Sequence, residues 1–204
     1  MMTIRRPLPV LLPLVLLAAC QSSLDARVTR FSAGTPPAPG RTFSILPDTR
    51  QAGNLEFQHY AEMVAARLRG LGFRPLPHEG EPAELEVTLA YADAGRHMQY
   101  FNDPGPYWAG WGGVGGSGWW GWSGAYAPNL NGYTVYAKTL EVDIFDGPAW
   151  RAGERRMLWQ GDVFGESQFP DLASVMPAMT EAAFQNFPGP SGQTVQVSVP
   201  INPD

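Results

Sequence analysis

The stretch Glu84-Leu85-Glu86-Val87-Thr88-Leu89-Ala90-Tyr91 decides the fold, because its apolar residues recur with a period of two. Successive side chains of a β-strand point to opposite faces of the sheet. The acidic residues of the stretch therefore face water, and its apolar face carries Leu85, Val87, Leu89 and Tyr91. This alternation predicts a half-buried strand of the kind found in antiparallel sheets that pack one face on a core.

Other segments of the chain have β-strand composition and are bounded by turn residues. They are, in order, 27–31, 42–46, 133–145, 157–164 and 194–199. The first is expected at a sheet edge. In the third, Lys138 interrupts the apolar phase, which indicates a bulge or an exposed end. In the fourth, Gln160 and Asp162 share the face opposite Trp159.

A first helix is predicted from Asn54, a candidate N-cap, to about residue 71. Its apolar residues recur every three to five positions, at Leu55, Tyr60, Val64, Leu68 and Leu71. His59 lies beside this apolar stripe. We expect His59 to be partly buried and hydrogen-bonded rather than a metal ligand.

A second helix is predicted from Asp171 or Ser174 to Phe187. Pro177 lies within this segment, and proline lacks the N–H that an interior helical position donates. If Ser174 is the cap, Pro177 falls in the first turn, where no intrahelical hydrogen bond is lost. The prolines that follow Phe187 end the helix.

The order of elements is β-β-α-β-β-β-α-β, with links of hairpin length among the middle strands. This order predicts an α+β fold, namely an antiparallel β-sheet with two helices packed on one face and a long Gly/Trp-rich loop between strands. We expect a signal peptide over residues 1–19, a lipidated N-terminus and tether over 20–40, and a single domain over 41–204.

The only cysteine, Cys20, ends the run Leu17-Ala18-Ala19-Cys20 after a short apolar segment that follows Arg5 and Arg6. The run resembles the lipobox of bacterial lipoproteins, whose cysteine is acylated and becomes the first residue of the mature protein. The alternatives are a transmembrane anchor or a buried helix. A span needs about 20 apolar residues, however, and this segment is shorter and carries three prolines.

The mature chain is acidic, because removal of residues 1–19 takes away two arginines and leaves 12 basic and 19 acidic residues. Without a basic cluster we expect no binding to nucleic acid, which requires neutralisation of phosphates. Membrane attachment would then rest on the acyl chains at Cys20. Since no other cysteine is present, disulfides within the domain are impossible and a packed core must stabilise it.

Four short motifs follow the lipobox in order: Leu71-Gly72-Phe73, Ala83-Glu84-Leu85-Glu86-Val87-Thr88-Leu89, Leu158-Trp159-Gln160-Gly161 and Asn186-Phe187-Pro188. Their order and spacing resemble bacterial lipoproteins of domain of unknown function 4136 over about residues 27–188. Glu84 stands where the family pattern has Asp, and the tail from Gly189 lies outside it. The resemblance implies an envelope lipoprotein with a helix-on-sheet domain that faces the periplasm, and it brings no catalytic residues. With Gln21 after the cysteine, it favours the outer membrane.

The segment at about 100–132 holds five of the seven tryptophans among many glycines. Glycine loses much conformational entropy on folding, which favours a long loop there. Flat aromatic side chains can contact a sugar, a protein or a membrane interface, or they can cover an open sheet face. Both interpretations stay open. The candidate contact residues are Tyr107, Trp108, Trp111, Trp119, Trp120, Trp122 and Tyr126.

Other candidate chemistry is weak. His59, His78 and His97 lack metal-ligand spacing, and we expect no metal and no cofactor. Ser117 lacks the context of a nucleophile elbow, and the glycines around it form no phosphate-binding motif. The pairs Glu84/Glu86 and Glu141/Asp143 would each share a strand face and suit a glycosidase, but alternation on an exposed sheet face produces such pairs without catalysis.

The sequence thus predicts a non-catalytic envelope lipoprotein that binds an unknown envelope protein or glycan. One alternative is a structural envelope protein in which the Gly/Trp-rich segment completes the fold. Another, less favoured, is a hydrolase of cell-wall glycan that uses one of the carboxylate pairs.

Overall fold

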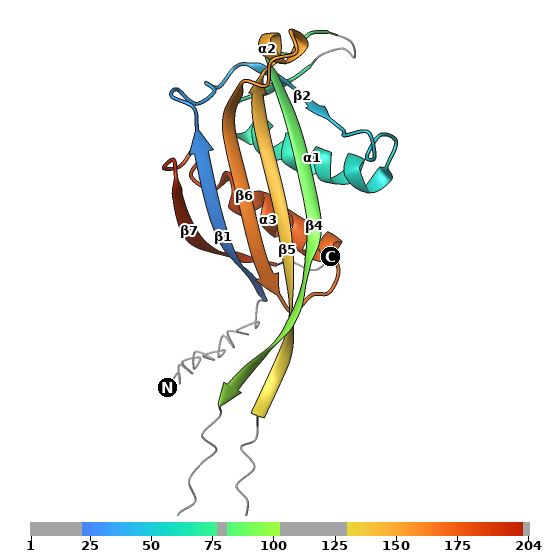
Figure 1. Ribbon diagram of the computed structural model, residues 1–204, viewed down its shortest axis with the longest axis vertical. Coiled ribbons are helices and arrows are strands. Elements are labelled where there is room, and N and C mark those ends of the chain that lie inside the picture. Colours follow the sequence, from blue (N-terminus) through green and yellow to red (C-terminus); the bar gives the residue numbers. More distant parts are fainter. Residues whose placement is uncertain (1–21, 77–80, 103–129, 202–204) are drawn as a thin grey trace, which may run out of the picture.

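The structure is a computed structural model that describes residues 22–76, 81–102 and 130–201. These residues form a seven-stranded sheet with the strand order β3-β2-β4-β5-β6-β1-β7 (Figure 1). The strands are β1 (Ser23–Ser32), β2 (Thr42–Leu46), β3 (Arg74–Pro75), β4 (Leu85–Asn102), β5 (Leu130–Asp146), β6 (Met157–Ser167) and β7 (Gln193–Pro200). The helices of the described residues are α1 (Leu55–Gly70), α2 (Gly147–Arg151) and α3 (Leu172–Phe184).

The prediction of a purely antiparallel sheet is wrong, because β2 runs parallel to both of its neighbours, β3 and β4. The remaining pairs, which join β4, β5, β6, β1 and β7 in that order, are antiparallel. The cause is the position of α1 in the chain. This helix lies between β2 and β4, and a crossover through a helix brings the next strand back parallel to the first. The sheet is therefore mixed.

A short helix, α2, was also missing from the predicted fold, which has a loop after β5. Asp146 caps α2, since its side chain accepts a hydrogen bond from the Ala149 backbone N–H at 3.0 Å. Pro148 lies in the first turn, where proline is tolerated. Local capping chemistry therefore turns this connection into one turn of helix.

The first strand is not at an edge, since β1 lies between β6 and β7. It begins at Ser23, within the segment expected to be a tether. The edges of the sheet are β3 and β7. The strands β4 and β5 are longer than the sequence predicts, and they remain paired as far as Asn102 and Leu130.

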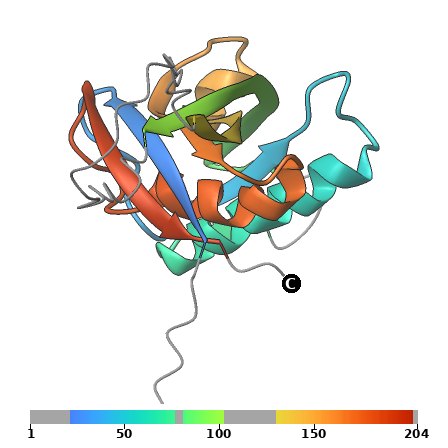
Figure 2. The ribbon, with the colours of Figure 1, turned by 90° about the horizontal axis from the view of Figure 1, so that it is seen from below.

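The two longer helices cover one face of the sheet and contact each other (Figures 1 and 2). Asn54 caps α1 as predicted, accepting a hydrogen bond from the Glu56 N–H at 2.8 Å. Leu55, expected on the apolar stripe, is 77% exposed, and Phe57 is buried instead.

Asp171 is the N-cap of α3. Its side chain accepts a hydrogen bond from the Ser174 N–H at 2.9 Å. Pro177 therefore lies inside the helix rather than in its first turn. It leaves one carbonyl of the preceding turn without its usual donor.

The core lies between the helices and the sheet. Trp159 of β6 is completely buried, stacks on Phe184 at 5.5 Å between ring centroids, and donates its indole N–H to the Pro188 carbonyl at 3.0 Å. Buried residues around it include Val28, Val64, Leu68, Val87, Val142, Val163, Val175, Met176 and Met179. The described part of the chain holds no helix long and apolar enough to cross a membrane.

Candidate functional site

The face of the sheet opposite α1 and α3 carries no helix layer among the described residues (Figure 2). Strand pairing aligns one residue from each of five neighbouring strands in a row across this face. The row consists of Ala90, Glu141, Asp162, Thr29 and Thr194. The hydroxyls of Thr29 and Thr194 lie 2.7 Å apart, so the row ends in a hydrogen-bonded pair.

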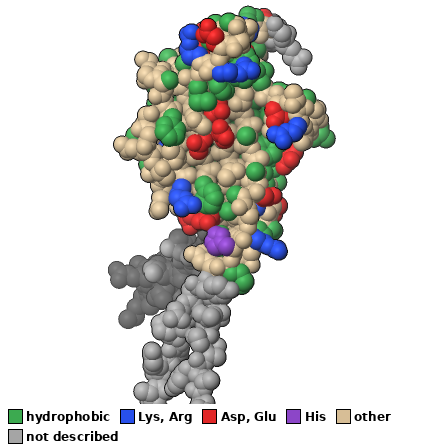
Figure 3. All heavy atoms as spheres, viewed as in Figure 1, with side chains coloured by type: hydrophobic (Ala, Val, Ile, Leu, Met, Phe, Trp, Pro, Cys, Tyr) green, Lys and Arg blue, Asp and Glu red, His purple; other side chains and the backbone are tan. Residues whose placement is uncertain are grey.

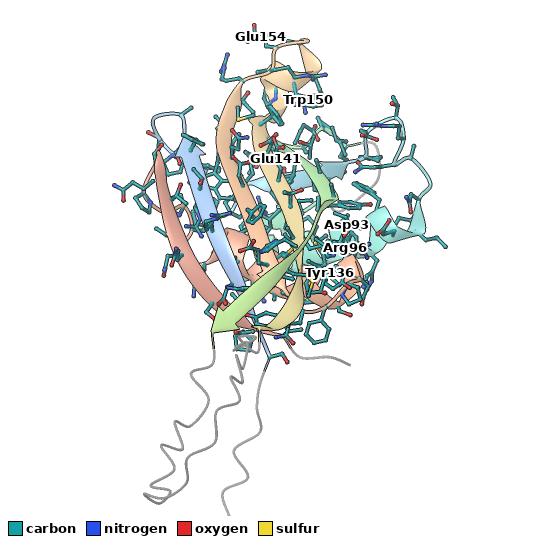
Figure 4. The ribbon with its side chains drawn as sticks, turned by 60° about the horizontal axis from the view of Figure 1, so that its bottom comes forward. Asp93, Arg96, Tyr136, Glu141, Trp150 and Glu154 are labelled. Carbon is teal, nitrogen blue, oxygen red and sulfur yellow. The ribbon has the colours of Figure 1, made fainter. Side chains whose placement is uncertain are left out.

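Two adjoining hollows lie along this face, and both are lined by Ala90 and Glu141. We call them together the open-face groove. One hollow, of about 560 Å³, includes Asp162 and Phe164. The other, of about 580 Å³, includes Asp143, Trp150 and Arg155. Acidic side chains gather near the middle of this face (Figure 3), and Figure 4 shows Glu141 on β5 and Trp150 on α2.

Three carboxylates, those of Glu141, Asp143 and Asp162, stand together in the groove. Glu141 is opposite Asp162 in the ladder, and Asp143 is two residues further along β5 on the same face. The Gln160 side-chain amide donates to Glu141 Oε1 and to Asp162 Oδ1, each at 3.2 Å. The Oδ1 atom of Asp143 is buried and has no hydrogen-bond partner in the described part of the chain.

Burial and neighbouring charge make the two aspartates, Asp143 and Asp162, weaker acids. Desolvation and the negative charges of Glu141 and Asp162 raise the pKa of Asp143 from its ordinary 3.8 to about 7. Desolvation and the charge of Glu141 also raise the pKa of Asp162, whereas the hydrogen bond from Gln160 acts in the opposite direction. At neutral pH the cluster therefore holds protons that isolated aspartates would release.

Two arginines flank the carboxylates, and each one lies over an aromatic ring. The guanidinium carbon of Arg27 is 4.5 Å from the centre of the Phe164 ring. That of Arg155 is 3.5 Å from the Trp150 ring centre. Cation–π contact holds both arginines against the wall of the groove. The groove thus has an acidic middle between two basic, aromatic borders.

The glycosidase alternative requires two carboxyl groups separated by about 5–5.5 Å in a retaining enzyme or by about 6.5–9.5 Å in an inverting one. Glu141 and Asp143 lie two residues apart on one face of β5, and Glu141 is opposite Asp162 of β6. No group of three metal-ligating side chains suited to an ion occurs in residues 22–76, 81–102 and 130–201. The arrangement suits an organic cation or several hydrogen-bond donors.

Several residues singled out in the sequence fall elsewhere. Glu84 precedes β4 and accepts a hydrogen bond from the Thr42 N–H at 2.9 Å. Glu86 is buried under α2, 3.4 Å from Arg151. This pair is therefore not part of the groove, whereas Glu141 and Asp143 are. His59 is exposed rather than partly buried.

Other predicted site residues lie outside the described residues. They are Cys20, His78, Tyr107, Trp108, Trp111, Ser117, Trp119, Trp120, Trp122 and Tyr126. Conversely, the sequence did not single out Asp162 and Gln160 as site residues. Their alternation in β6 predicted a shared face, but only the pairing of β6 with β5 brings them to Glu141.

These features define a helix-on-sheet domain in which the described residues leave one polar sheet face open. The chain belongs to the family described as Domain of unknown function (DUF4136), whose model matches residues 27–189. The predicted family membership is confirmed.

The solved structures that are similar to the chain include two of low sequence identity. One is a PDZ domain protein from Parabacteroides distasonis ATCC 8503, with 10% identity and a TM-score of 0.48; the match covers 87% of this chain and 39% of that one. The chain thus spans well under half of that protein. The other is a dodecamer of a PelC variant from Paraburkholderia phytofirmans, with 13% identity and a TM-score of 0.38, covering 78% of this chain and 94% of that one. No curated protein matches the chain.

Proposed function

We propose that the protein is a non-catalytic envelope lipoprotein that faces the periplasm and binds a basic segment of a partner protein in the open-face groove. The observation that carries this proposal is the clustering of Glu141, Asp143 and Asp162 on the uncovered sheet face. Like charges directly opposite each other destabilise a sheet. A cluster retained at such a cost is a candidate for function.

Charge complementarity defines the kind of partner. A lysine or arginine side chain placed among the three carboxylates would relieve their mutual repulsion and supply donors to Asp143 Oδ1, which has none from the described residues. The groove thus fits a cationic side chain better than an anion or a purely apolar segment.

Attachment to the envelope rests on Cys20. The lipobox-like run and the family resemblance support acylation at this residue and a place in the outer membrane. We expect Cys20→Ser to give a soluble or unprocessed protein in fractionated cells. Membrane retention of a correctly cleaved variant would contradict the lipoprotein assignment.

The binding proposal is tested by site-specific photo-crosslinking of the full chain in its native envelope. A photoreactive residue replaces Ala90, which is exposed in the groove. A matched control replaces Ala66, an exposed alanine on α1. We expect an adduct from position 90 alone, mapped to a partner segment that contains lysine or arginine.

Exchange of the charges on the two proteins then distinguishes specific binding from an adduct that forms by chance proximity. Glu141→Lys should abolish the adduct, and an acidic substitution of the partner's basic residue should restore it. The proposal fails if the adduct forms equally from position 66, if Glu141→Lys leaves it unchanged, or if the captured segment is not basic. A glycan adduct would instead favour a carbohydrate-binding module.

The structural alternative concerns the Gly/Trp-rich segment. β4 and β5 stay paired up to Asn102 and Leu130, so deletion of residues 105–128 leaves strand ends that a short hairpin loop can join. Loss of cooperative melting after this deletion would favour the structural alternative. A folded variant that no longer forms the adduct would show that the segment contributes a contact, as the sequence predicts for its tryptophans.

A further inference from the structure

The two edges of the sheet differ in how they are protected against pairing with another chain. At one edge, β3 has two residues, Arg74 and Pro75, and combines a charge with a proline. At the other edge, β7 has eight residues, carries no charge, and has its only proline at the last position, Pro200. Short length, charge and proline are the usual protection of an exposed edge. Among the described strands, β7 pairs with β1 alone, and it is neither short nor charged and has proline only at its last position.

Alternate residues of β7 form backbone hydrogen bonds with β1, and the residues between them direct their N–H and C=O groups away from β1. The Ile201 N–H donates to the Ser22 carbonyl at 2.8 Å, which makes these two residues a hydrogen-bonded pair. Such pairs alternate along an antiparallel ladder. The residues of β7 that bond to β1 are therefore Gln193, Val195, Val197 and Val199. Those whose N–H and C=O groups point away from β1 are Thr194, Gln196 and Ser198.

We propose that this edge pairs antiparallel with the same edge of a second copy of the chain, with Gln196 on the two-fold axis. In this register, Thr194 of each copy faces Ser198 of the other. The backbone N–H and C=O groups that point away from β1 belong to every second residue, Thr194, Gln196 and Ser198. In this register all of these groups form hydrogen bonds with the other copy. A one-pair shift in one direction would place Pro200, which has no N–H, opposite Thr194. The shift in the other direction would pair Ser198 with Gly192, which lies outside the strand. The strand is therefore self-complementary about Gln196.

Side-chain chemistry favours the same partner. A two-fold axis perpendicular to the sheet keeps the helix layer on the same side in both copies. Val195 then faces Val197 of the other copy on the helix side, where both are half-buried in the single chain. Thr194, Gln196 and Ser198 meet their counterparts on the open face. Because β7 is uncharged, the acidic net charge of the chain brings no repulsion into the ladder.

The test is sedimentation of the full chain in detergent over a range of concentrations. We expect the wild type to show a doubling of protein mass that is lost in Gln196→Pro. Proline is tolerated at this position of an edge strand, because the Gln196 N–H points away from β1. Gln196→Lys is a second variant that keeps the backbone intact and places like charges across the axis. It should also be monomeric, and its melting temperature should equal that of the wild type at concentrations too low for the wild type to dimerise.

Contact at the axis is measured independently. Gln196→Cys should form a disulfide between copies on oxidation, since directly paired strand residues lie within disulfide range. Ala66→Cys, on the exposed face of α1, is the control and should not. The proposal is overturned if the wild type stays monomeric, if Gln196→Lys still forms the dimer, or if position 66 crosslinks as readily as position 196. Pairing of β7 with a strand of a different protein, in place of a second copy, would also overturn it.

Discussion

Glu141 of β5 lies directly opposite Asp162 of β6, so two carboxylates face each other across neighbouring strands. The side-chain amide of Gln160 donates to both, at 3.2 Å each. One neutral amide cannot neutralise two charges, and opposed like charges destabilise an antiparallel pair. The pairing therefore keeps the middle of the open-face groove acidic at a cost in stability.

Removal of one charge from this pair should stabilise the fold. Asp162→Asn keeps an oxygen that can accept from Gln160 and abolishes the repulsion with Glu141. We expect the free energy of unfolding at pH 8 to rise by about 0.5–1 kcal/mol, measured by urea denaturation. Glu81→Gln, which changes an exposed carboxylate outside the sheet, is the control and should have a smaller effect. A loss of stability in Asp162→Asn would contradict the argument.

Close packing beneath Trp159 gives a second prediction. A Cβ atom at Gly161 would overlap the Trp159 ring, which is completely buried and cannot move aside. Gly161→Ala should therefore destabilise the protein by about 1–3 kcal/mol in thermal or chemical unfolding. A Cβ at Gly70, at the end of α1, would meet no atom within 4 Å. Gly70→Ala should thus be neutral or slightly stabilising, and equal losses in the two variants would show that Trp159 is not the obstacle.

The buried guanidinium of Arg30 forms hydrogen bonds with carbonyl groups at the C-terminal end of α3. Arg30 is only 2% exposed, and its guanidinium donates to the carbonyls of Ala182 at 2.8 Å and Ala183 at 3.0 Å, in the last turn of α3. Helix C-termini attract positive charge, and their last carbonyls lack intrahelical donors. The buried arginine thus ties β1 to α3.

Arg30→Met keeps most of the aliphatic volume and leaves those two buried carbonyls without a donor. We expect a loss of about 2–3 kcal/mol in the free energy of unfolding. Arg27→Met is the matched control, since Arg27 lies on the same strand but on the exposed face, over Phe164. Its effect should stay below about 0.5 kcal/mol. Comparable losses in both variants would mean that the helix terminus does not need Arg30.

Local pattern predicted most of the elements but not how they pair. The alternation at 84–91 and the cap at Asn54 depend on neighbouring residues, and both appear in the structure. The parallel pairing of β2 with β4 depends on where α1 packs, which is a tertiary property. The antiparallel prediction failed for this reason. The same limit applies to the groove, because the alternation of each strand gives its faces but not the strand beside it.

Lys138 interrupts the apolar alternation of β5, and its contacts with distant parts of the chain explain why a lysine can stand there. The sequence predicts a bulge or an exposed end at this residue. The register shift lies on the facing strand, between Asp93 and Gly95, and Lys138 itself is 1% exposed. Its ammonium group donates to the Pro170 carbonyl at 2.6 Å and lies 2.7 Å from Asp93 Oδ1. The partners come from distant segments, so no local pattern could identify them.

The carboxylate cluster should also make stability depend on pH. The pKa of Asp143 is raised from 3.8 to about 7 in the folded chain, first by burial and then by Glu141 and Asp162. Between these two pH values the folded state binds more protons than the unfolded state. The favourable contribution of protonated Asp143 is then fully present below pH 4 and is lost as the pH rises to about 7.

Asp143→Asn should remove this dependence, because an amide does not titrate. At pH 8 we expect the variant to be more stable than the wild type by about 1–2 kcal/mol, a value reduced for the partial solvent exposure of the side chain. At pH 4, where Asp143 is protonated in the folded wild type, the difference should nearly vanish. Urea denaturation at several pH values measures both quantities. A stability difference that stays constant from pH 4 to pH 8 would mean that Asp143 titrates alike in the folded and unfolded chains.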